Sequence, residues 1–248
     1  MIIKKKYWQN NILNWYNKNK RQLPWRKKNN QNFYSIWLSE VMLQQTQVKT
    51  VIPYFLKFKN KWSSLKSFSD ATLDEILFLW QGMGYYRRAT NIYKTLQILK
   101  KKKLKEITYD SLLELPGIGE YTASSITAIL NDSNKAVIDG NIKRVISRAF
   151  NISTTSRKSL EKIRQKAQAL TPDFGNKDYC QALMDLGSII CKPKNPNCFL
   201  CPVNKLCSFT KSKKKTIISN KKNIITKIGA VFFIKAKEYV FIQKSDDS

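Results

Sequence analysis

The sequence of 248 residues contains no histidine. Every site that depends on an imidazole is therefore excluded, including Ser–His–Asp triads and histidine-ligated metals. Acidic residues are also scarce, with 17 Asp and Glu against 45 Lys and Arg. No apolar run reaches the roughly 18 residues of a membrane helix, and the N-terminus lacks the apolar core of a signal peptide. We therefore expect a cytoplasmic globular protein with no membrane segment.

The formal net charge of +28 favours an anionic partner. Nucleic acid fits best, because lysine and arginine neutralise phosphates and release counterions. Most of the basic residues are lysines, however, and asparagine and isoleucine are abundant. Drift toward AT-rich codons produces the same mixture. We assign about half of the excess charge to this drift. The positive sign of the charge therefore indicates an anionic partner, whereas its magnitude indicates nothing further.

Glycine and proline are few, at 8 and 7 residues, and they separate stretches of helical periodicity. Apolar residues recur every three or four positions over 36–52 and 73–80, which predicts helices. Thr72 and Glu75 form a candidate capping box before the second stretch. Asp110 is a candidate N-cap for residues 111–115. The periodicity predicts an all-α body of about 210 residues.

Strand-like alternation begins only near the C-terminus. Ala230–Ile234 and Tyr239–Ile242 predict two strands around a Lys-Ala-Lys-Glu turn. The preceding residues, 211–227, are rich in Lys, Ser and Asn at their start and are interpreted as a linker. A short β segment is thus expected over 228–248.

Four of the five cysteines form a C-x6-C-x2-C-x5-C pattern and are Cys191, Cys198, Cys201 and Cys207. Disulfides are unfavoured, since nothing indicates an oxidising compartment. Structural zinc is the main alternative, but zinc modules usually use two C-x2-C pairs. One close pair with a single thiolate on each side suits an iron–sulfur cubane better. We interpret the four residues as ligands of a [4Fe-4S] cluster and Cys180 as a small buried apolar residue.

The segment Leu115-Pro116-Gly117-Ile118-Gly119 lies between two predicted helices. Its glycines permit a tight hairpin and a close approach of a partner's backbone. A helix that starts near Glu120 would direct its free amides toward that partner. The segment is either an ordinary helix–helix turn or a site for a DNA phosphate.

Two carboxyl groups are candidates for chemistry. Asp139 precedes Gly140 and a predicted helix. It caps that helix, takes part in catalysis, or does both. A capping carboxylate is expected to have a low pKa. Glu40 lies in a mostly apolar stretch between Trp37 and Val41. A surface position is the plain alternative, but burial would raise its pKa and make it a proton donor near neutral pH.

Four motifs in order, Ser39 to Val48, Leu115 to Tyr121, Val137 to Arg144 and the four cysteines, closely resemble the helix–hairpin–helix DNA glycosylases of the endonuclease III superfamily. More narrowly, they resemble its adenine DNA glycosylase (MutY-type) branch, over about Tyr7 to Cys207. The resemblance implies two helical domains with a DNA cleft between them. A six-helix barrel with the hairpin motif would span 31–135, and a cluster domain would combine 1–30 with 136–210.

The resemblance also implies a reaction. Superfamily members with lyase activity carry a lysine two residues after the second hairpin glycine, where this chain has Tyr121. A phenol forms no imine, so the implied enzyme is monofunctional and hydrolytic. Adenine opposite 8-oxoguanine or guanine would be flipped into a pocket, where Glu40 protonates it and Asp139 and Tyr121 stabilise the cationic sugar.

Further positions follow from the resemblance alone. Gln45 and Tyr85 match residues that insert into the base stack, although Tyr85 is also a candidate core aromatic. Arg26 and Asp185 match the pocket for the base. The DNA-binding set comprises Gln45, Tyr85, Gly117, Gly119 and Asn141. Double-stranded DNA with A:8-oxoguanine or A:G mispairs is the expected partner of a monomer associated with the nucleoid.

The chain departs from the family at its end. Full members continue into a Nudix-like domain that reads the oxidised guanine, whereas this chain stops about two strands into that region. We expect a fragment or a shortened gene, with weak discrimination between oxidised and normal guanine. Two alternatives to the adenine glycosylase stay open: a bifunctional glycosylase and lyase of the endonuclease III type, and a decayed DNA-binding iron–sulfur protein without turnover.

Overall fold

The computed structural model describes residues 2–101, 106–211, 235–236 and 239–240. Residues 1–214 form one compact unit and residues 215–248 form another. No helix in the described ranges is long and apolar enough to cross a membrane. The first unit is helical, which confirms the expected all-α class.

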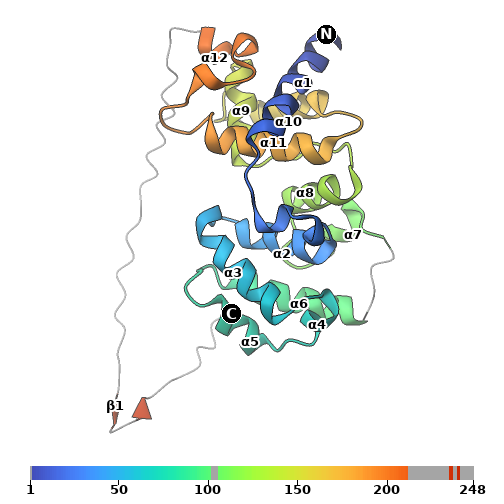
Figure 1. Cartoon of the computed structure of the whole chain (residues 1–248), viewed down its shortest axis with the longest axis vertical. Coiled ribbons are helices and arrows are strands. Elements are labelled where there is room, and N and C mark those ends of the chain that lie inside the picture. Colours follow the sequence, from blue (N-terminus) through green and yellow to red (C-terminus); the bar gives the residue numbers. More distant parts are fainter. Residues whose placement is uncertain (1, 102–105, 212–234, 237–238, 241–248) are drawn as a thin grey trace. The chain divides into compact units, whose positions relative to one another are not determined.

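The helices of the first unit pack in two groups (Figure 1). One group comprises α1 (Ile2–Asn19), α9 (Gly140–Phe150), α10 (Arg157–Leu170), α11 (Asn176–Ile189) and α12 (Ser208–Lys211). The other comprises α2 (Phe33–Leu43), α3 (Val48–Lys61), α4 (Leu65–Ser69), α5 (Leu73–Trp80), α6 (Arg87–Lys101), α7 (Tyr109–Leu113) and α8 (Glu120–Asn131). Short 3-10 turns are η1 (Pro24–Arg26), η2 (Lys28–Asn30), η3 (Cys198–Leu200) and η4 (Asn204–Leu206).

The groups meet where α8 packs against both α2 and α11. Asp132, which ends α8 in a left-handed conformation, strengthens this junction. Its carboxylate accepts the backbone N–H groups of Gly175 and Lys177 at 2.7 and 2.8 Å, so the end of α8 caps the start of α11. The predicted domains, 31–135 and 1–30 with 136–210, contain the same helices as these two groups. The division into domains itself stays a prediction.

Aromatic side chains fill the core of the second group. Phe58, Phe68 and Trp80 are fully buried, and Phe58 meets the other two rings edge-on at 5.8 and 6.0 Å. Such edge-to-face contacts add to the burial of apolar area. A rigid core of this kind fixes the helices that carry the site.

The helix starts are partly those that the sequence predicts. The capping box of Thr72 and Glu75 is confirmed at α5, as is the start of α8 at Glu120. The prediction for Asp110 is wrong, because Thr108 caps α7 and Asp110 lies in its first turn. The Thr108 side chain reaches the free amide of Ser111, whereas an acid in the first turn interacts only with the helix dipole.

The second unit contains an antiparallel pair, β1 (Lys235–Ala236) and β2 (Tyr239–Val240). Strand β2 lies within the predicted second strand. The sequence predicts Lys235 and Ala236 in the turn, and this prediction is wrong: they pair with Val240 and Tyr239. The predicted strand over 230–234 and nearly all of the linker, 212–227, lie outside the described residues.

Candidate active site

The three residues predicted to be catalytic line one cavity of about 440 Å³. Glu40 comes from α2, Tyr121 from the first turn of α8, and Asp139 from the residue before α9. The Tyr121 hydroxyl donates a hydrogen bond to Glu40 Oε2 at 2.9 Å. Arg26 and Asn141 line the same cavity. Residues far apart in the sequence therefore converge on a space lined by two acids, a phenol, a guanidinium and an amide.

Glu40 is placed by a helix that is buried on all sides. Asn32 caps α2 by accepting the Ser35 amide, and all residues of the helix from Tyr34 to Met42 are buried. Only 4% of Glu40 is exposed. Burial raises the pKa of Glu40 to about 7, although the Tyr121 hydrogen bond favours the ionised form. Glu40 therefore carries a proton in a large share of molecules at neutral pH.

Asp139 is held rigidly as the N-cap of α9. Its Oδ1 accepts the Ile142 amide at 2.6 Å, and its Oδ2 accepts Asn141 Nδ2 at 2.8 Å. The cap is confirmed, but the expected low pKa is not. Burial raises the pKa of Asp139 more than the hydrogen bonds from Ile142 and Asn141 lower it. Repulsion from Asp139 in turn contributes to the raised pKa of Glu40.

The glycine hairpin fixes Tyr121. Gly117 has a φ of +79°, and a Cβ there would come within 2.7 Å of the Asn91 side chain, so glycine is required. Gly119 is the N-cap of α8. Gln44 Nε2 donates to the Gly117 carbonyl and to Thr122 Oγ1 at 3.2 and 3.1 Å, which ties the end of α2 to the hairpin. Burial raises the pKa of Tyr121 far above its usual range, so its hydroxyl remains a donor.

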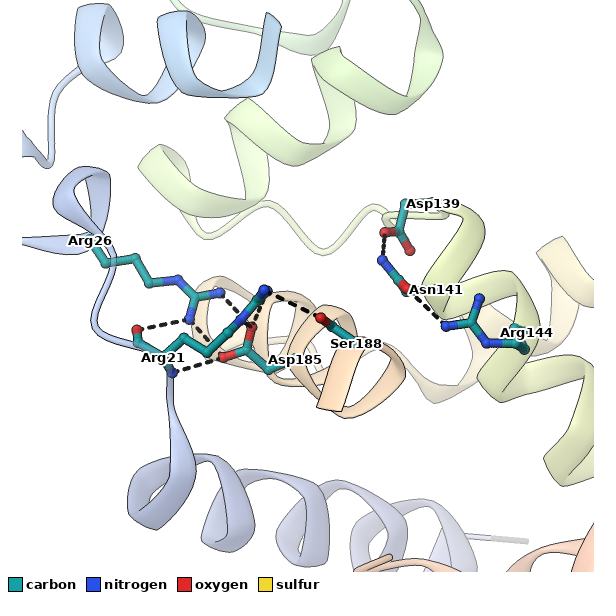
Figure 2. A network of polar contacts seen from close by, with 7 residues as sticks. All are labelled: Arg21, Arg26, Asp139, Asn141, Arg144, Asp185 and Ser188. Atoms are coloured by element: carbon teal, nitrogen blue, oxygen red, sulfur yellow. Dashed lines mark hydrogen bonds and ion pairs between the residues drawn. The ribbon is translucent and has the colours of Figure 1, made fainter. Parts of the chain in front are cut away.

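Asp185 is fully buried and binds two arginines (Figure 2). Arg26 donates to both carboxylate oxygens at 2.7 and 3.1 Å, and Arg21 donates from Nε at 2.7 Å. Burial opposes ionisation, yet the two guanidinium groups keep the pKa of Asp185 below its usual value. Arg21 and Ser188 line the cavity beside Arg26, and no sequence motif marks either residue. Asp185 therefore holds the arginines, which face the cavity, and does not line the cavity itself. Its predicted contact with the base stays a prediction.

Figure 2 also shows a chain of contacts that leads away from Asp139. Asn141 Oδ1 accepts Arg144 NH2 at 2.9 Å, and Arg144 donates to the Gly187 and Cys191 carbonyls, both at 2.7 Å. Asn141 therefore links the capping acid to the start of the cysteine segment. Its predicted contact with DNA stays a prediction.

Gln45 and Tyr85 lie on exposed turns rather than in the core. Tyr85 is 60% exposed, so it is not a core aromatic. Both residues have left-handed backbones, with φ of 57° and 51°. Such conformations are uncommon for residues with a Cβ and often mark functional sites.

The four predicted ligand cysteines line one small cavity beside α9. Arg148 NH1 lies 3.4 Å from the Cys191 sulfur. Among the residues described, no three His, Cys, Asp or Glu side chains are placed to hold a metal ion together. Cys180 is buried apart from the four, as expected.

Comparisons with known proteins agree with this geometry. Residues 38–172 match the HhH-GPD superfamily of base excision DNA repair proteins. An adenine DNA glycosylase of Buchnera aphidicola subsp. Baizongia pistaciae is 43% identical over 94% of this chain and 68% of that protein. The human adenine DNA glycosylase is 38% identical over 79% of this chain and 38% of that protein.

Solved structures show the same fold. A thermostable thymine-DNA glycosylase has a TM-score of 0.75 and 27% identity, covering 84% of this chain and 97% of that one. Endonuclease III in a non-covalent DNA complex has a TM-score of 0.70, covering 85% and 97%. At 20% identity, this second likeness concerns the fold alone. By its matched residues, its relatives and its fold, the chain belongs to the HhH-GPD superfamily of base excision DNA repair proteins.

Proposed function

We propose that this protein is a DNA repair N-glycosylase that removes adenine mispaired with 8-oxoguanine or guanine, by hydrolysis of the N-glycosidic bond. One observation carries the proposal: Glu40, Asp139 and Tyr121 line a single cavity, with Glu40 buried and hydrogen-bonded to Tyr121. The curated relatives named adenine DNA glycosylase support the choice of base. Double-stranded DNA is the partner, and the protein acts as a monomer.

Glu40 is the general acid. Adenine leaves poorly as an anion, and protonation at N7 makes it a neutral leaving group. A pKa of about 7 suits this task, because the acid is then protonated in a useful fraction of molecules and still transfers its proton readily. Once ionised, Glu40 can accept a proton from the attacking water.

Asp139 stabilises the charge that develops on the sugar. Cleavage of the glycosidic bond leaves an oxocarbenium-like cation, and a fixed carboxylate opposite it lowers the energy of the transition state. The Ile142 and Asn141 hydrogen bonds hold this carboxylate in place before the reaction. No reorganisation is then needed as the charge forms.

The nucleophile is water, because Tyr121 has no amine. Its phenol occupies the position from which an amine would attack the sugar, and it donates to Glu40 instead. Arg21, Arg26 and Ser188 supply donors along the cavity wall for the edge of the flipped base. Asp185 holds the two arginines from behind.

The glycine hairpin, Leu115 to Gly119, binds the DNA backbone. The free amides at the start of α8, next to Gly117 and Gly119, suit a phosphate oxygen. Asn141 lines the active-site cavity. Gln45 and Tyr85 enter the base stack beside the flipped adenine. These contacts position the duplex without reading its sequence.

A [4Fe-4S] cluster fits the cysteine segment. Cys191, Cys198, Cys201 and Cys207 supply four thiols around one cavity, and the Arg148 guanidinium beside Cys191 suits a negatively charged sulfur. A bound cluster would supply four metal–thiolate bonds that fix this loop. Lys192, Lys194 and Lys205 would then be presented to DNA phosphates.

Removing either acid tests the mechanism. We expect Glu40→Gln and Asp139→Asn each to slow single-turnover adenine release from an A:8-oxoguanine duplex by about 100-fold or more. Duplex affinity, measured in parallel by fluorescence anisotropy, should stay within about threefold, because neither acid holds the DNA backbone. Near-normal release rates in either variant would refute the assignment.

The same Glu40→Gln change should stabilise the protein at alkaline pH. The Glu40 carboxyl has an ordinary pKa of 4.5 and a folded value of about 7, so the folded state retains a proton that the unfolded chain releases between these values. Stability therefore falls as pH rises through this window, by up to about 3 kcal/mol. Urea unfolding should show Glu40→Gln more stable than the parent at pH 8, and by less than about 1 kcal/mol at pH 5. Equal stability at both pH values would place the carboxyl in contact with water.

Trapping distinguishes the hydrolase from a lyase. We expect borohydride to trap no covalent complex between the protein and its DNA product, because Tyr121 cannot form the imine that borohydride reduces. Endonuclease III serves as the positive control on its own substrate. A trapped adduct that forms at the rate of adenine release would favour the bifunctional alternative.

Metal analysis tests the cluster. Protein purified without oxygen should contain about four iron and four sulfide per chain and absorb visible light. Cys198→Ser should lower both contents and the absorbance, whereas Cys180→Ser, at a buried thiol outside the segment, should keep them. One zinc per chain with no visible absorbance would refute the assignment.

A further inference from the structure

Two turns near the active site share an unfavourable backbone conformation. Gln45 follows α2 and Tyr85 precedes α6, and each has a left-handed φ although it carries a side chain. The two residues are 40 positions apart in the sequence, and both are exposed. Something in the fold must hold both turns, because an L-residue leaves this conformation readily when nothing constrains it.

Arg88, in the first turn of α6, contacts both turns. Only 7% of Arg88 is exposed. On the Gln45 side, NH1 donates to the Met42 and Gln44 carbonyls at 2.7 and 2.6 Å, and NH2 donates to Thr46 Oγ1 at 3.0 Å. Met42 lies in the last turn of α2, and Gln44 and Thr46 lie on either side of Gln45. The guanidinium thus closes the end of α2 and fixes the turn that follows.

The same guanidinium binds the Tyr85 turn. NH2 donates to the Gly84 carbonyl at 3.0 Å, which also accepts Trp80 Nε1 at 3.0 Å. Nε donates to the Tyr85 carbonyl at 3.4 Å. The guanidinium carbon lies 5.2 Å from the Trp80 ring and 5.3 Å from the Tyr85 ring. The Tyr85 ring therefore lies against the Arg88 guanidinium, while most of the residue remains exposed to solvent.

We propose that Arg88 is a positioning residue that locks the Gln45 turn and the Tyr85 turn into one fixed arrangement, so that both side chains enter the base stack of DNA together. The inference rests on the proposed function, in which these two side chains contact DNA. Insertion of two side chains into a duplex is favoured when both are already in place, because no ordering then accompanies binding. Arg88 lies behind both turns and does not line the active-site cavity.

The geometry requires an arginine. A planar guanidinium directs donors to two sides at once, whereas a lysine ammonium is a single point on a flexible stem. Arg88→Lys keeps the charge but reaches acceptors on one turn only. This variant therefore separates positioning from charge.

A double-mutant cycle tests the proposal. The proteins are Arg88→Lys, Tyr85→Ala, the variant with both changes, and Lys94→Gln as a matched control that removes an exposed charge from the same helix. Two measurements apply to each protein: fluorescence of 2-aminopurine placed next to the adenine of an A:8-oxoguanine duplex, which reports unstacking, and single-turnover adenine release. Circular dichroism and thermal melting verify that each variant is folded.

We expect Arg88→Lys and Tyr85→Ala each to reduce the unstacking signal and to slow release by about tenfold, and the double variant to be no more than about threefold slower than the slower single variant. Lys94→Gln should stay within about twofold of the parent. Losses that multiply to about 100-fold in the double variant would overturn the proposal, because Arg88 would then act independently of Tyr85. An unchanged unstacking signal in Tyr85→Ala would overturn it as well.

The outcomes also separate this inference from the proposed function. If the parent protein unstacks the duplex but releases no adenine, the glycosylase assignment fails and the 2-aminopurine cycle alone decides the role of Arg88. If Arg88→Lys does not fold, Thr46→Ala replaces it in the cycle, since it removes one acceptor of the guanidinium and leaves the others. We then expect a smaller loss of the same kind, about threefold, and no loss in that variant would overturn the proposal.

Discussion

The buried contact between the Glu40 carboxyl and the Tyr121 hydroxyl is the constraint on which the site depends. A carboxyl group inside a helical core is unfavourable unless it has a partner or carries a proton. Glu40 has both, because Tyr121 donates to it and burial raises its pKa to about 7. The packing of α2 against α8 therefore determines the protonation of Glu40 as well as filling the core. It creates an acid that carries a proton in a large share of molecules at neutral pH, beside a cavity of about 440 Å³.

The remaining polar groups are arranged so that few of them are free to move. Asp139 is fixed by the amide it caps, and Asp185 by two arginines. Arg88 fixes two exposed turns from below. In each case, a charged group is held by several hydrogen bonds. Asp139 lines the cavity itself, whereas Asp185 and Arg88 fix neighbouring groups. The proposed hydrolysis would gain from this arrangement, since it relies on preorganised charge rather than on a covalent nucleophile.

The sequence predicts which residues converge on the cavity better than it predicts their surroundings. The identities of Glu40, Tyr121 and Asp139 followed from motifs, and their meeting in one cavity agrees with that interpretation. The pKa of Asp139 was wrongly expected to be low, because capping was considered without burial. Arg21 and Ser188 were missed because nothing in the local pattern marks them. They reach the cavity only because the segment before η1 lies along α11.

By itself, the sequence determined the helical class, the starts of α5 and α8, the Asp139 cap and the residue types available for catalysis. These features depend on interactions within a few residues, which composition and spacing encode directly. The tertiary structure alone decided which acid is buried, that Asp185 faces arginines, and that Arg88 joins two turns. Burial and pairing depend on segments that are far apart in the sequence, 164 residues for Arg21 and Asp185. The free energies of those contacts exist only once the chain has folded.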